Sequence, residues 1–416
     1  MFDIDKWQEI IATIRKNRLR TFLTACGVFW GMFMLLMMLG FGSGLETGVS
    51  QSMRGFATNS VYVWGQRTSM PYKGLQPGRR VSYTNEDTEL ILRNVDGIKH
   101  IAPRLQLGGW RDGNGVVYKD KVGNFGIAGD YPAIRHIQPM QMRKGRFLNQ
   151  LDLADKRKVA VIGSQVKRIL FGRHKNPIGE HIRIKGVYFT VVGLFDPMAD
   201  GERGVRQAST VFLPFTTFQS AFNQGNRVGW FALTGEANVS GTQLERRVRK
   251  VLAKRHKIHP KDRQAIGSFN AEQKFGKIKR LFGGIKALIW FVGVVTLFAG
   301  VLGVSNIMLI TVKERTKEIG IRKTLGGTPA SIMTMIIQEA IVLTAIAGYA
   351  GVVISVGVLE LFSKVLGSSN EMLRNPQVDF GVAVTAAAIL VVAGALAGVM
   401  PARHAVKINP VEALRA

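Results

Sequence analysis

The chain of 416 residues contains a single cysteine, Cys26, and that cysteine lies inside an apolar run. An intrachain disulfide needs two cysteines and thiolate metal sites use several, so both are excluded. We interpret Cys26 as a small packing residue in an apolar environment.

Signatures of common catalytic sites are missing as well. The chain has no G-x-x-x-x-G-K-[ST] phosphate loop, no G-x-S-x-G nucleophile elbow and no H-E-x-x-H zinc motif. The closest histidine pair, His256 and His259, lies in a strongly basic segment, where neighbouring positive charge opposes the binding of a cation. The sequence therefore predicts a chain that is not an enzyme and that holds no metal and no cofactor of its own.

Acidic residues are scarce, with 28 Asp+Glu against 56 Lys+Arg and a formal net charge of +28. Residues 50–284 hold 40 of the basic residues and 17 of the acidic ones. Such a surplus raises the question of nucleic acid. The basic residues are scattered, however, and no nucleic-acid-binding motif occurs. We therefore expect this segment to lie beside anionic lipid headgroups and other polyanions, with no nucleic acid partner.

Long apolar sequence is abundant, and it is concentrated towards the two ends of the chain. Runs with few or no formal charges cover residues 21–45, 287–312, 330–359 and 380–400. As helices rising 1.5 Å per residue, most of them reach about 30 Å, the thickness of a hydrocarbon core. The sequence therefore predicts four transmembrane helices (TM1 to TM4) over these ranges.

Basic residues beside these runs predict the topology. Residues 1–20 form an expected amphipathic helix, and basic clusters also occupy 313–327 and 401–416. By the positive-inside rule, these three segments are cytoplasmic, and so are both termini. Residues 50–284 and the short loop 360–379 then lie outside the cytoplasm. We interpret the first apolar run as an uncleaved signal anchor.

The segment 50–284 has the mixed pattern of an α+β domain. Two strand–helix–strand units are expected to flank a β-rich middle, and the middle contains a hairpin turning at Lys185-Gly186. The expected strands and helices of the flanking units are Val61–Trp64, Thr84–Asn94, Ile98–Leu107, Trp230–Thr234, Gln243–Arg255 and a short strand near Ile266. Exposed turns are predicted at Asp112–Gly115 and Asp200–Gly204.

A charged segment separates the second and third apolar runs. Glu314 and Glu318 are four residues apart, on one face of a predicted helix over 313–327. The glycine pair that follows can end this helix, and Thr328-Pro329 can begin the next one. A short capped helix held between two membrane spans is suited to carrying force between the membrane and a partner in the aqueous phase.

Four polar side chains interrupt the predicted spans: Ser305, Asn306, Gln338 and Glu339. Ser305 and Asn306 either hydrogen-bond to another helix or make only local contacts. Glu339 is either a functional carboxylate within the membrane or an interfacial residue paired with Lys313 or Arg322. The sequence leaves both alternatives open.

Three stretches resemble a known family. Glu314–Gly327 and the C-terminal pair Pro401-Ala-Arg and Asn409–Arg415 resemble the cytoplasmic signatures of MacB/FtsX-type ABC transporter permeases. Val161–Gly172 with Asn176–Ile184 resembles the periplasmic core domain of the MacB branch. The matches occur in the family's order and, with the four spans, cover nearly the whole chain.

The resemblance implies a membrane α-helical protein with a large α+β extracytoplasmic domain, in a homodimer in the bacterial inner membrane. That domain would comprise a Porter lobe (50–110 and 215–280) and a Sabre lobe (111–214). Segment 313–327 would be the coupling helix that meets two copies of a separate ATPase, which binds ATP and Mg. The residues implied to meet the ATPase are Glu314, Arg315, Glu318, Ile319, Arg322 and Lys323. The alternative is a solvated interfacial helix with internal ion pairs.

The function implied is export or efflux by mechanotransmission, with a periplasmic adaptor and a TolC-like outer-membrane channel as further partners alongside membrane lipid. MacB itself carries a fused N-terminal ATPase, whereas about twenty residues precede the first span here, so the chain resembles the split permeases of the family. The alternatives are a lipoprotein-releasing permease and an FtsX-like signalling module that activates cell-wall hydrolases. The resemblance does not identify the cargo.

Overall fold

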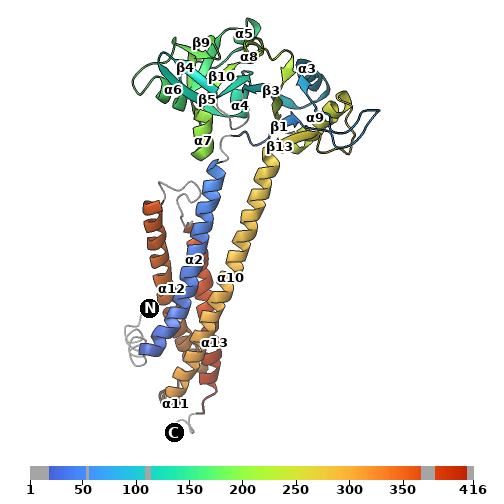
Figure 1. Cartoon of the computed structure of the whole chain (residues 1–416). Coiled ribbons are helices and arrows are strands. Elements are labelled where there is room, and N and C mark those ends of the chain that lie inside the picture. The colour runs from blue at the N-terminus through green and yellow to red at the C-terminus, as the bar shows by residue number, and fades with distance from the viewer. Residues whose placement is uncertain (1–17, 53–55, 108–113, 367–379, 410–416) are drawn as a thin grey trace. The chain divides into compact units, whose positions relative to one another are not determined.

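The computed structural model describes residues 18–52, 56–107, 114–366 and 380–409 (Figure 1). It divides the chain into two compact units. Met1–Val49 and Leu281–Ala416 form what we call the helical unit, and Ser50–Arg280 forms the α+β unit. The predicted amphipathic helix 1–20 lies almost entirely outside the described residues, as does most of the loop 360–379.

Within the described residues, the helical unit contains four helices long and apolar enough to cross a membrane, as predicted. These are α2 (Arg18–Ser52), α10 (Ala271–Glu314), α12 (Pro329–Leu366) and α13 (Phe380–Val406), and the short α11 (Thr316–Thr324) joins two of them. α10 has 44 residues and is about 66 Å long at 1.5 Å per residue, far longer than the predicted span 287–312.

α13 also outlasts its predicted range of 380–400. The helix continues through Pro401 to Val406, although proline lacks the N–H that an interior helical position uses. Ala402 and Ala405 beyond it are fully buried in the apolar cluster of the helical unit. This packing holds the last turns in place against the local preference of proline.

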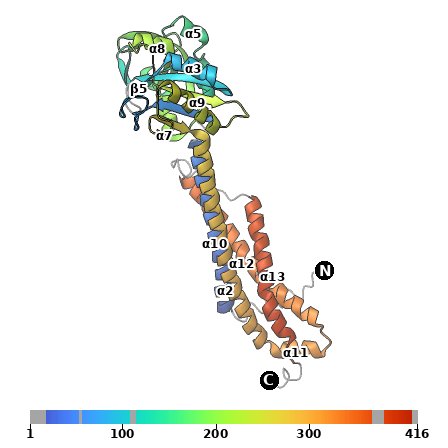
Figure 2. The same cartoon turned by 90° about the vertical axis from the view of Figure 1, so that its right-hand side faces the viewer.

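Glycine lets two pairs of helices approach closely. A Cβ added at Gly300 of α10 would lie 3.1 Å from the backbone nitrogen of Val28 in α2. One added at Gly348 of α12 would lie 1.9 Å from the Leu390 side chain of α13. Small residues at helix contacts are typical of membrane packing. In Figure 2, α2 lies behind α10 and runs along it, in keeping with the close approach at Gly300.

Large apolar side chains cover the outside of the helical unit. Phe291 and Leu302, both on α10, are each 68% exposed. A soluble surface rarely carries contiguous apolar side chains of this size. Their exposure fits a surface that meets lipid or another membrane helix.

The α+β unit contains thirteen strands and seven further helices within its described residues. The strands are β1 (Ser60–Gly65), β2 (Tyr83–Thr84), β3 (Ile98–Leu107), β4 (Asn114–Tyr118), β5 (Lys121–Asp130), β6 (Met140–Gly145), β7 (Val159–Gly163), β8 (His181–Ile184), β9 (Val187–Pro197), β10 (Thr210–Pro214), β11 (Arg227–Val228), β12 (Trp230–Gly235) and β13 (Ile266–Asn270). The helices are α3 (Asn85–Asn94), α4 (Ile134–Ile137), α5 (Gln150–Ala154), α6 (Ser164–Leu170), α7 (Gly201–Ala208), α8 (Phe215–Ala221) and α9 (Gly241–Arg255).

Two groups of strands meet at β3. Strands β3, β12, β1 and β13 form an antiparallel layer in that order, and with α3 and α9 they make the split β-α-β arrangement. In the second group, the spatial order of hydrogen-bonded neighbours is β5, β4, β8, β9, β7 and β10. Because β10 also pairs with β5, this group closes on itself. The first group comes from the ranges assigned to the Porter lobe and the second from the range assigned to the Sabre lobe.

The junction of the two groups contains a buried ion pair. Arg104 of β3 lies 2.7 Å from Asp130 of β5, although its Nε–H is not aligned for a hydrogen bond, and their side chains are 8% and 0% exposed. The guanidinium also lies over the rings of Trp230, at 4.8 Å, and Phe212, at 5.4 Å. Burial raises the pKa of Asp130 to about 6, while the adjacent guanidinium acts to lower it.

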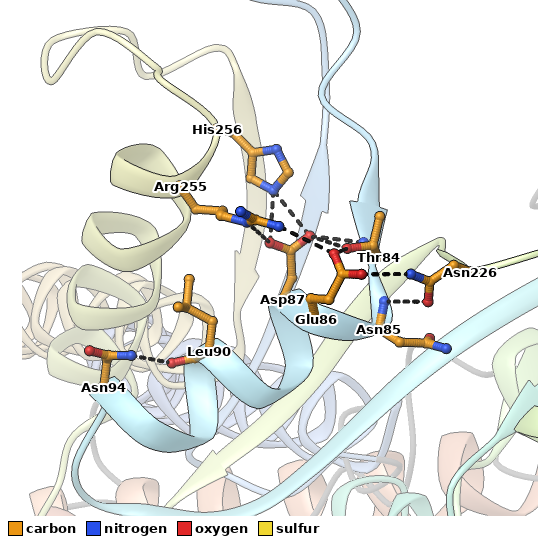
Figure 3. A network of polar contacts seen from close by, with 9 residues as sticks. All are labelled: Thr84, Asn85, Glu86, Asp87, Leu90, Asn94, Asn226, Arg255 and His256. Atoms are coloured by element: carbon orange, nitrogen blue, oxygen red, sulfur yellow. Dashed lines mark hydrogen bonds and ion pairs between the residues drawn. The ribbon is translucent and has the colours of Figure 1, made fainter.

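The two predicted helices of the first group are confirmed, and a polar network joins them (Figure 3). The Thr84 backbone N–H donates to Asp87 at 2.8 Å, which completes a capping box at the start of α3. Asp87 is fully buried, and His256 at the end of α9 lies 3.0 Å from it. Arg255 pairs with Glu86 at 3.2 Å. The start of α3 is therefore bound to the end of α9.

The β-rich middle confirms one predicted turn and corrects another. Ile184 pairs with Val187 across the predicted hairpin turn at Lys185-Gly186. Asp200–Gly204 was expected to be an exposed turn, but Asp200 is the N-cap residue of α7 and the other four residues begin that helix. Within α7, Glu202 and Arg206 form an i,i+4 ion pair at 2.6 Å. In the other expected turn, Asn114 and Gly115 begin β4, and the residues before them lie outside the described part.

Candidate functional site

The charged segment between α10 and α12 is the site predicted from the sequence, and it does not form one helix (Figure 1). α10 runs to Glu314, Arg315 has φ −99° and ψ 15°, and α11 then covers Thr316–Thr324. α11 is therefore shorter than the helix predicted over residues 313–327. The Thr316 hydroxyl donates to the Lys313 carbonyl at 2.6 Å, near the end of α10, where carbonyls lose regular helical partners.

Arg315 sits at this break and joins two carboxylates. It donates to Glu318 at 3.0 Å and to Glu339 of α12 at 3.4 Å. The side chains of Arg315 and Glu339 are 17% and 7% exposed, whereas that of Glu318 is 43% exposed. Glu339 is thus a buried carboxylate with a cation beside it. The partners predicted for Glu339 were Lys313 and Arg322, and Arg315 was not among them.

The structure does not place the predicted coupling residues on one exposed surface. Ile319 is 3% exposed and packs in the apolar cluster of the helical unit. Arg322 pairs with Glu318 at 3.3 Å. The Lys323 ammonium donates to the carbonyls of Val406 and Ile408, at 2.5 Å and 2.8 Å. These contacts bind the segment to its own chain.

A different set of side chains points outward. Glu314 and Lys317 are exposed, and Ile321 and Leu325 are 44% and 82% exposed. We call these four residues the outer face of the charged segment. Sequence reasoning named only Glu314 among them. The usable signal was the spacing of Lys317, Ile321 and Leu325, which are four residues apart and so share one helical face.

The polar residues of the predicted spans also differ in exposure. Ser305 is buried at 9% exposure, while Asn306 and Gln338 are exposed on the surface of the helical unit. Within the described residues, neither Ser305 nor Asn306 hydrogen-bonds to another helix. Asn306 and Gln338 lie where lipid or another chain would meet them.

The histidine pair considered as a metal site has other contacts. His256 lies 3.0 Å from Asp87, and the ring of His259 packs edge-on against Tyr72 at 5.4 Å between centroids. Among the described residues, no group of three or more His, Cys, Asp or Glu side chains is arranged to hold a metal ion. The pair contributes to packing of the α+β unit.

Comparison with protein families identifies the class of the chain. Residues 21–251 match the MacB-like periplasmic core domain, and residues 290–410 match the FtsX-like permease C-terminal domain. The first match alone covers more than half of the chain. The chain therefore belongs to the family of ABC transporter permeases that combine these two domains.

Individual relatives agree with this class. The macrolide export ATP-binding/permease protein MacB of Bdellovibrio bacteriovorus is 27% identical over 405 residues, which are 97% of this chain and 60% of that protein. The pyoverdine export ATP-binding/permease protein PvdT of Pseudomonas savastanoi pv. phaseolicola is 29% identical over 402 residues, 96% of this chain and 57% of that protein. This chain thus spans 57–60% of the length of these two relatives.

Solved structures include similar domains. The periplasmic region of MacB from Actinobacillus actinomycetemcomitans covers 55% of this chain and 95% of its own, at 18% identity and a TM-score of 0.43. The extracellular domain of the noncanonic ABC-type transporter YknZ covers 51% of this chain and 100% of its own, at 17% identity and a TM-score of 0.41.

Proposed function

We propose that this chain is the permease subunit of an ABC exporter, and that the outer face of its charged segment docks on a separate ATP-binding subunit. The observation that carries the proposal is the exposure of Ile321 and Leu325, two apolar side chains that share a helical face with the exposed Lys317. Apolar side chains rimmed by charges are typical of protein contacts. Arg315 links the segment to α12 through its ion pairs with Glu318 and Glu339. These contacts would transmit a displacement of the outer face to the membrane helices.

The continuity of α10 supports coupling by movement of helices. Strand β13 ends at Asn270, α10 begins at the next residue, and the Asn270 side chain accepts the Gln273 backbone N–H at 3.1 Å. The same helix ends at Glu314, one residue before the break. A displacement of its far end would pass to β13 without an intervening loop. This is the mechanical requirement of mechanotransmission.

The remaining features of the proposal follow from the class. The ATP-binding subunits would bind ATP and Mg and act as a pair on a homodimer of this chain. Both termini would be cytoplasmic, with the α+β unit in the periplasm. A periplasmic adaptor and a TolC-like outer-membrane channel would complete the export path.

The test uses the tagged full chain purified from its native membranes, with ATP hydrolysis measured in the purified fraction. The double variant Ile321→Asp/Leu325→Asp should co-purify with at least about tenfold less ATP hydrolysis, because fully burying one such side chain contributes about 1.5–3 kcal/mol. The matched control is Leu92→Asp, since Leu92 is a 54% exposed leucine in the α+β unit. The docking proposal is wrong if the double variant retains the ATPase, and the functional proposal is wrong if the unaltered chain never carries one.

A further inference from the structure

The α+β unit contains a basic cavity of about 850 Å³ that the proposed docking does not use. It is lined by α9, by the loop that contains Tyr72 and by the loop that contains Asp262. Among the described residues, its lining includes six cations: Lys73, Arg246, Arg249, Lys250, Lys254 and Arg263. The carboxylates among these described lining residues are Glu245 and Asp262.

Three of the cations form a stripe on α9. Arg246, Lys250 and Lys254 are four residues apart, so their side chains are neighbours along one helical face, where like charges repel. All three are exposed, and none has a carboxylate within ion-pair distance among the described residues. The opposite face of α9 packs in the core through Leu244 and Val248, so the stripe has no part in holding the helix down.

The two carboxylates of the cavity are engaged by groups other than the stripe. Glu245 accepts from the Arg249 guanidinium at 3.1 Å. Asp262 is buried and accepts from the backbone N–H of Ser69 at 2.7 Å and of Ala265 at 3.1 Å. Although burial acts to raise the pKa of Asp262, these hydrogen bonds outweigh it and lower that pKa. Neither acid pairs with the stripe, which leaves its positive charge uncompensated.

The loop of Tyr72 and Lys73, which lines the cavity together with the stripe, is fixed by backbone hydrogen bonds. Tyr72 and Leu75 exchange backbone hydrogen bonds of 3.1 Å and 3.0 Å, forming a tight turn. Lys73 in this turn has φ +49°, a conformation that non-glycine residues seldom adopt without support. The hydrogen bonds from Ser69 to Asp262 anchor the same loop. Lys73 is therefore held at the cavity by structure that would exist without a ligand.

We propose that the basic cavity binds a multiply charged, phosphate-bearing anion of headgroup size. Arg and Lys are the side chains that bind phosphate, and clustered cations in a concave site raise the local concentration of an anion. The volume falls in the range of pockets for small molecules, about 300–1,000 Å³, which fits a single headgroup rather than a polymer. A monocarboxylate would leave most of these cations unneutralised.

The phosphate can come from a lipid or from a soluble molecule. Gln273 of α10 lines the cavity, and four cations follow within the next seven residues, before the apolar run: Lys274, Lys277, Lys279 and Arg280. Basic clusters beside membrane spans attract anionic lipids. Both sources are therefore tested, and the proposal does not depend on the docking of an ATPase.

The experiment compares two charge-matched triple variants of the full chain in nanodiscs. The first replaces the stripe, as Arg246→Gln/Lys250→Gln/Lys254→Gln. The control, Lys121→Gln/Lys144→Gln/Lys158→Gln, removes the same charge from exposed lysines that do not line the cavity and form no ion pair in the described structure. Because all six side chains are exposed, both variants should fold, and the stripe variant should unfold at the same or a slightly higher temperature than the unaltered chain.

Pyrophosphate is the soluble probe, added to the chain in phosphatidylcholine nanodiscs and followed by calorimetry. A Lys or Arg near an anionic membrane surface contributes roughly fivefold in affinity. With the same factor for each cation of the stripe, the stripe variant should bind pyrophosphate about a hundredfold more weakly and the control within about threefold. The lipid arm adds phosphatidylglycerol to the nanodiscs. Anionic lipid should then raise the unfolding temperature of the unaltered chain and of the control, but not of the stripe variant.

The outcomes separate the sources and can overturn the proposal. Pyrophosphate binding without lipid stabilisation assigns a soluble phosphate, and the reverse assigns a lipid headgroup. Equal losses in the two triple variants would show that the response belongs to the diffuse positive charge of the α+β unit, which contradicts a specific site. The absence of any response to both probes would contradict it equally.

Discussion

The ion pairs of Arg315 predict that two glutamates close to the same cation contribute very differently to stability. Arg315 lies 3.4 Å from Glu339 and 3.0 Å from Glu318, so distance alone would rank Glu318 higher. Exposure ranks them the other way, because the Glu339 side chain is 7% exposed and that of Glu318 is 43% exposed. The pair of substitutions Glu339→Gln and Glu318→Gln decides between the two rankings.

The magnitude follows from the environment of each pair. Two unit charges at the 3.4 Å separation of Arg315 and Glu339 attract each other by about 5 kcal/mol at an effective dielectric constant of about 20. Desolvation offsets part of this attraction, and removing one partner of a buried pair destabilises by about 3–5 kcal/mol. Glutamine still accepts a hydrogen bond, so we expect about 3 kcal/mol for Glu339→Gln. The exposed pair with Glu318 should contribute about 0.2–1 kcal/mol.

The assay is thermal unfolding of the purified full chain in one detergent. At about 2–4 °C per kcal/mol, Glu339→Gln should lower the midpoint by roughly 6–12 °C and Glu318→Gln by at most about 4 °C. Adding Arg315→Gln to Glu339→Gln should destabilise by less than the sum of the single effects, because each single change already breaks the Arg315–Glu339 pair and the sum counts that loss twice. A larger loss from Glu318→Gln than from Glu339→Gln would refute the assignment of Glu339 as the buried anchor of the charged segment.

Three further predictions concern packing, pH and the polar network of α3. Gly300→Leu should destabilise by at least about 1–3 kcal/mol, because its side chain would clash with the α2 backbone. Gly284→Leu should be tolerated, because nothing lies within 4 Å of a Cβ added there. Equal unfolding temperatures of the two variants would contradict the close contact of α10 with α2. The lowered pKa of Asp262 means that its carboxylate stabilises the fold above its ordinary pKa of 3.8 and that this contribution is lost as pH falls through the lower folded value. Asp262→Asn should therefore lower the unfolding temperature at pH 7 by more than at pH 3, and a pH-independent difference would count against it. Asp87→Ala, which removes a buried cap (Figure 3), should destabilise by about 1–2 kcal/mol in chemical unfolding. The control is Glu89→Ala, on the exposed side of α3. An equal loss of stability in the control would show that the network of Asp87 does not stabilise the fold.

Features whose signal is local could be predicted from the sequence. The four membrane helices depend on runs of apolar residues, and the capped helix after Thr84 depends on residues within one turn of each other. The hairpin at Lys185-Gly186 likewise requires only a glycine in a two-residue loop. Each of these needs no knowledge of what packs against it.

Features that depend on distant contacts could not be predicted in this way. Asp200–Gly204 has the composition of a turn, yet it supplies the N-cap and the first residues of α7, and α13 passes through Pro401 because buried alanines beyond it pack in the core. Likewise, Glu339 lies 24 residues from Arg315, and only the folding of α12 beside α11 makes them partners.

The charged segment shows the division most clearly. The sequence by itself determined that a charged stretch lies between two membrane helices and that glycines end its short helix, because charge, hydropathy and backbone freedom are properties of individual residues. Only the tertiary structure decided that Ile319 turns inward while Ile321 and Leu325 turn outward. Which face of a helix is buried depends on the neighbouring helices, and these come from parts of the chain far away in sequence.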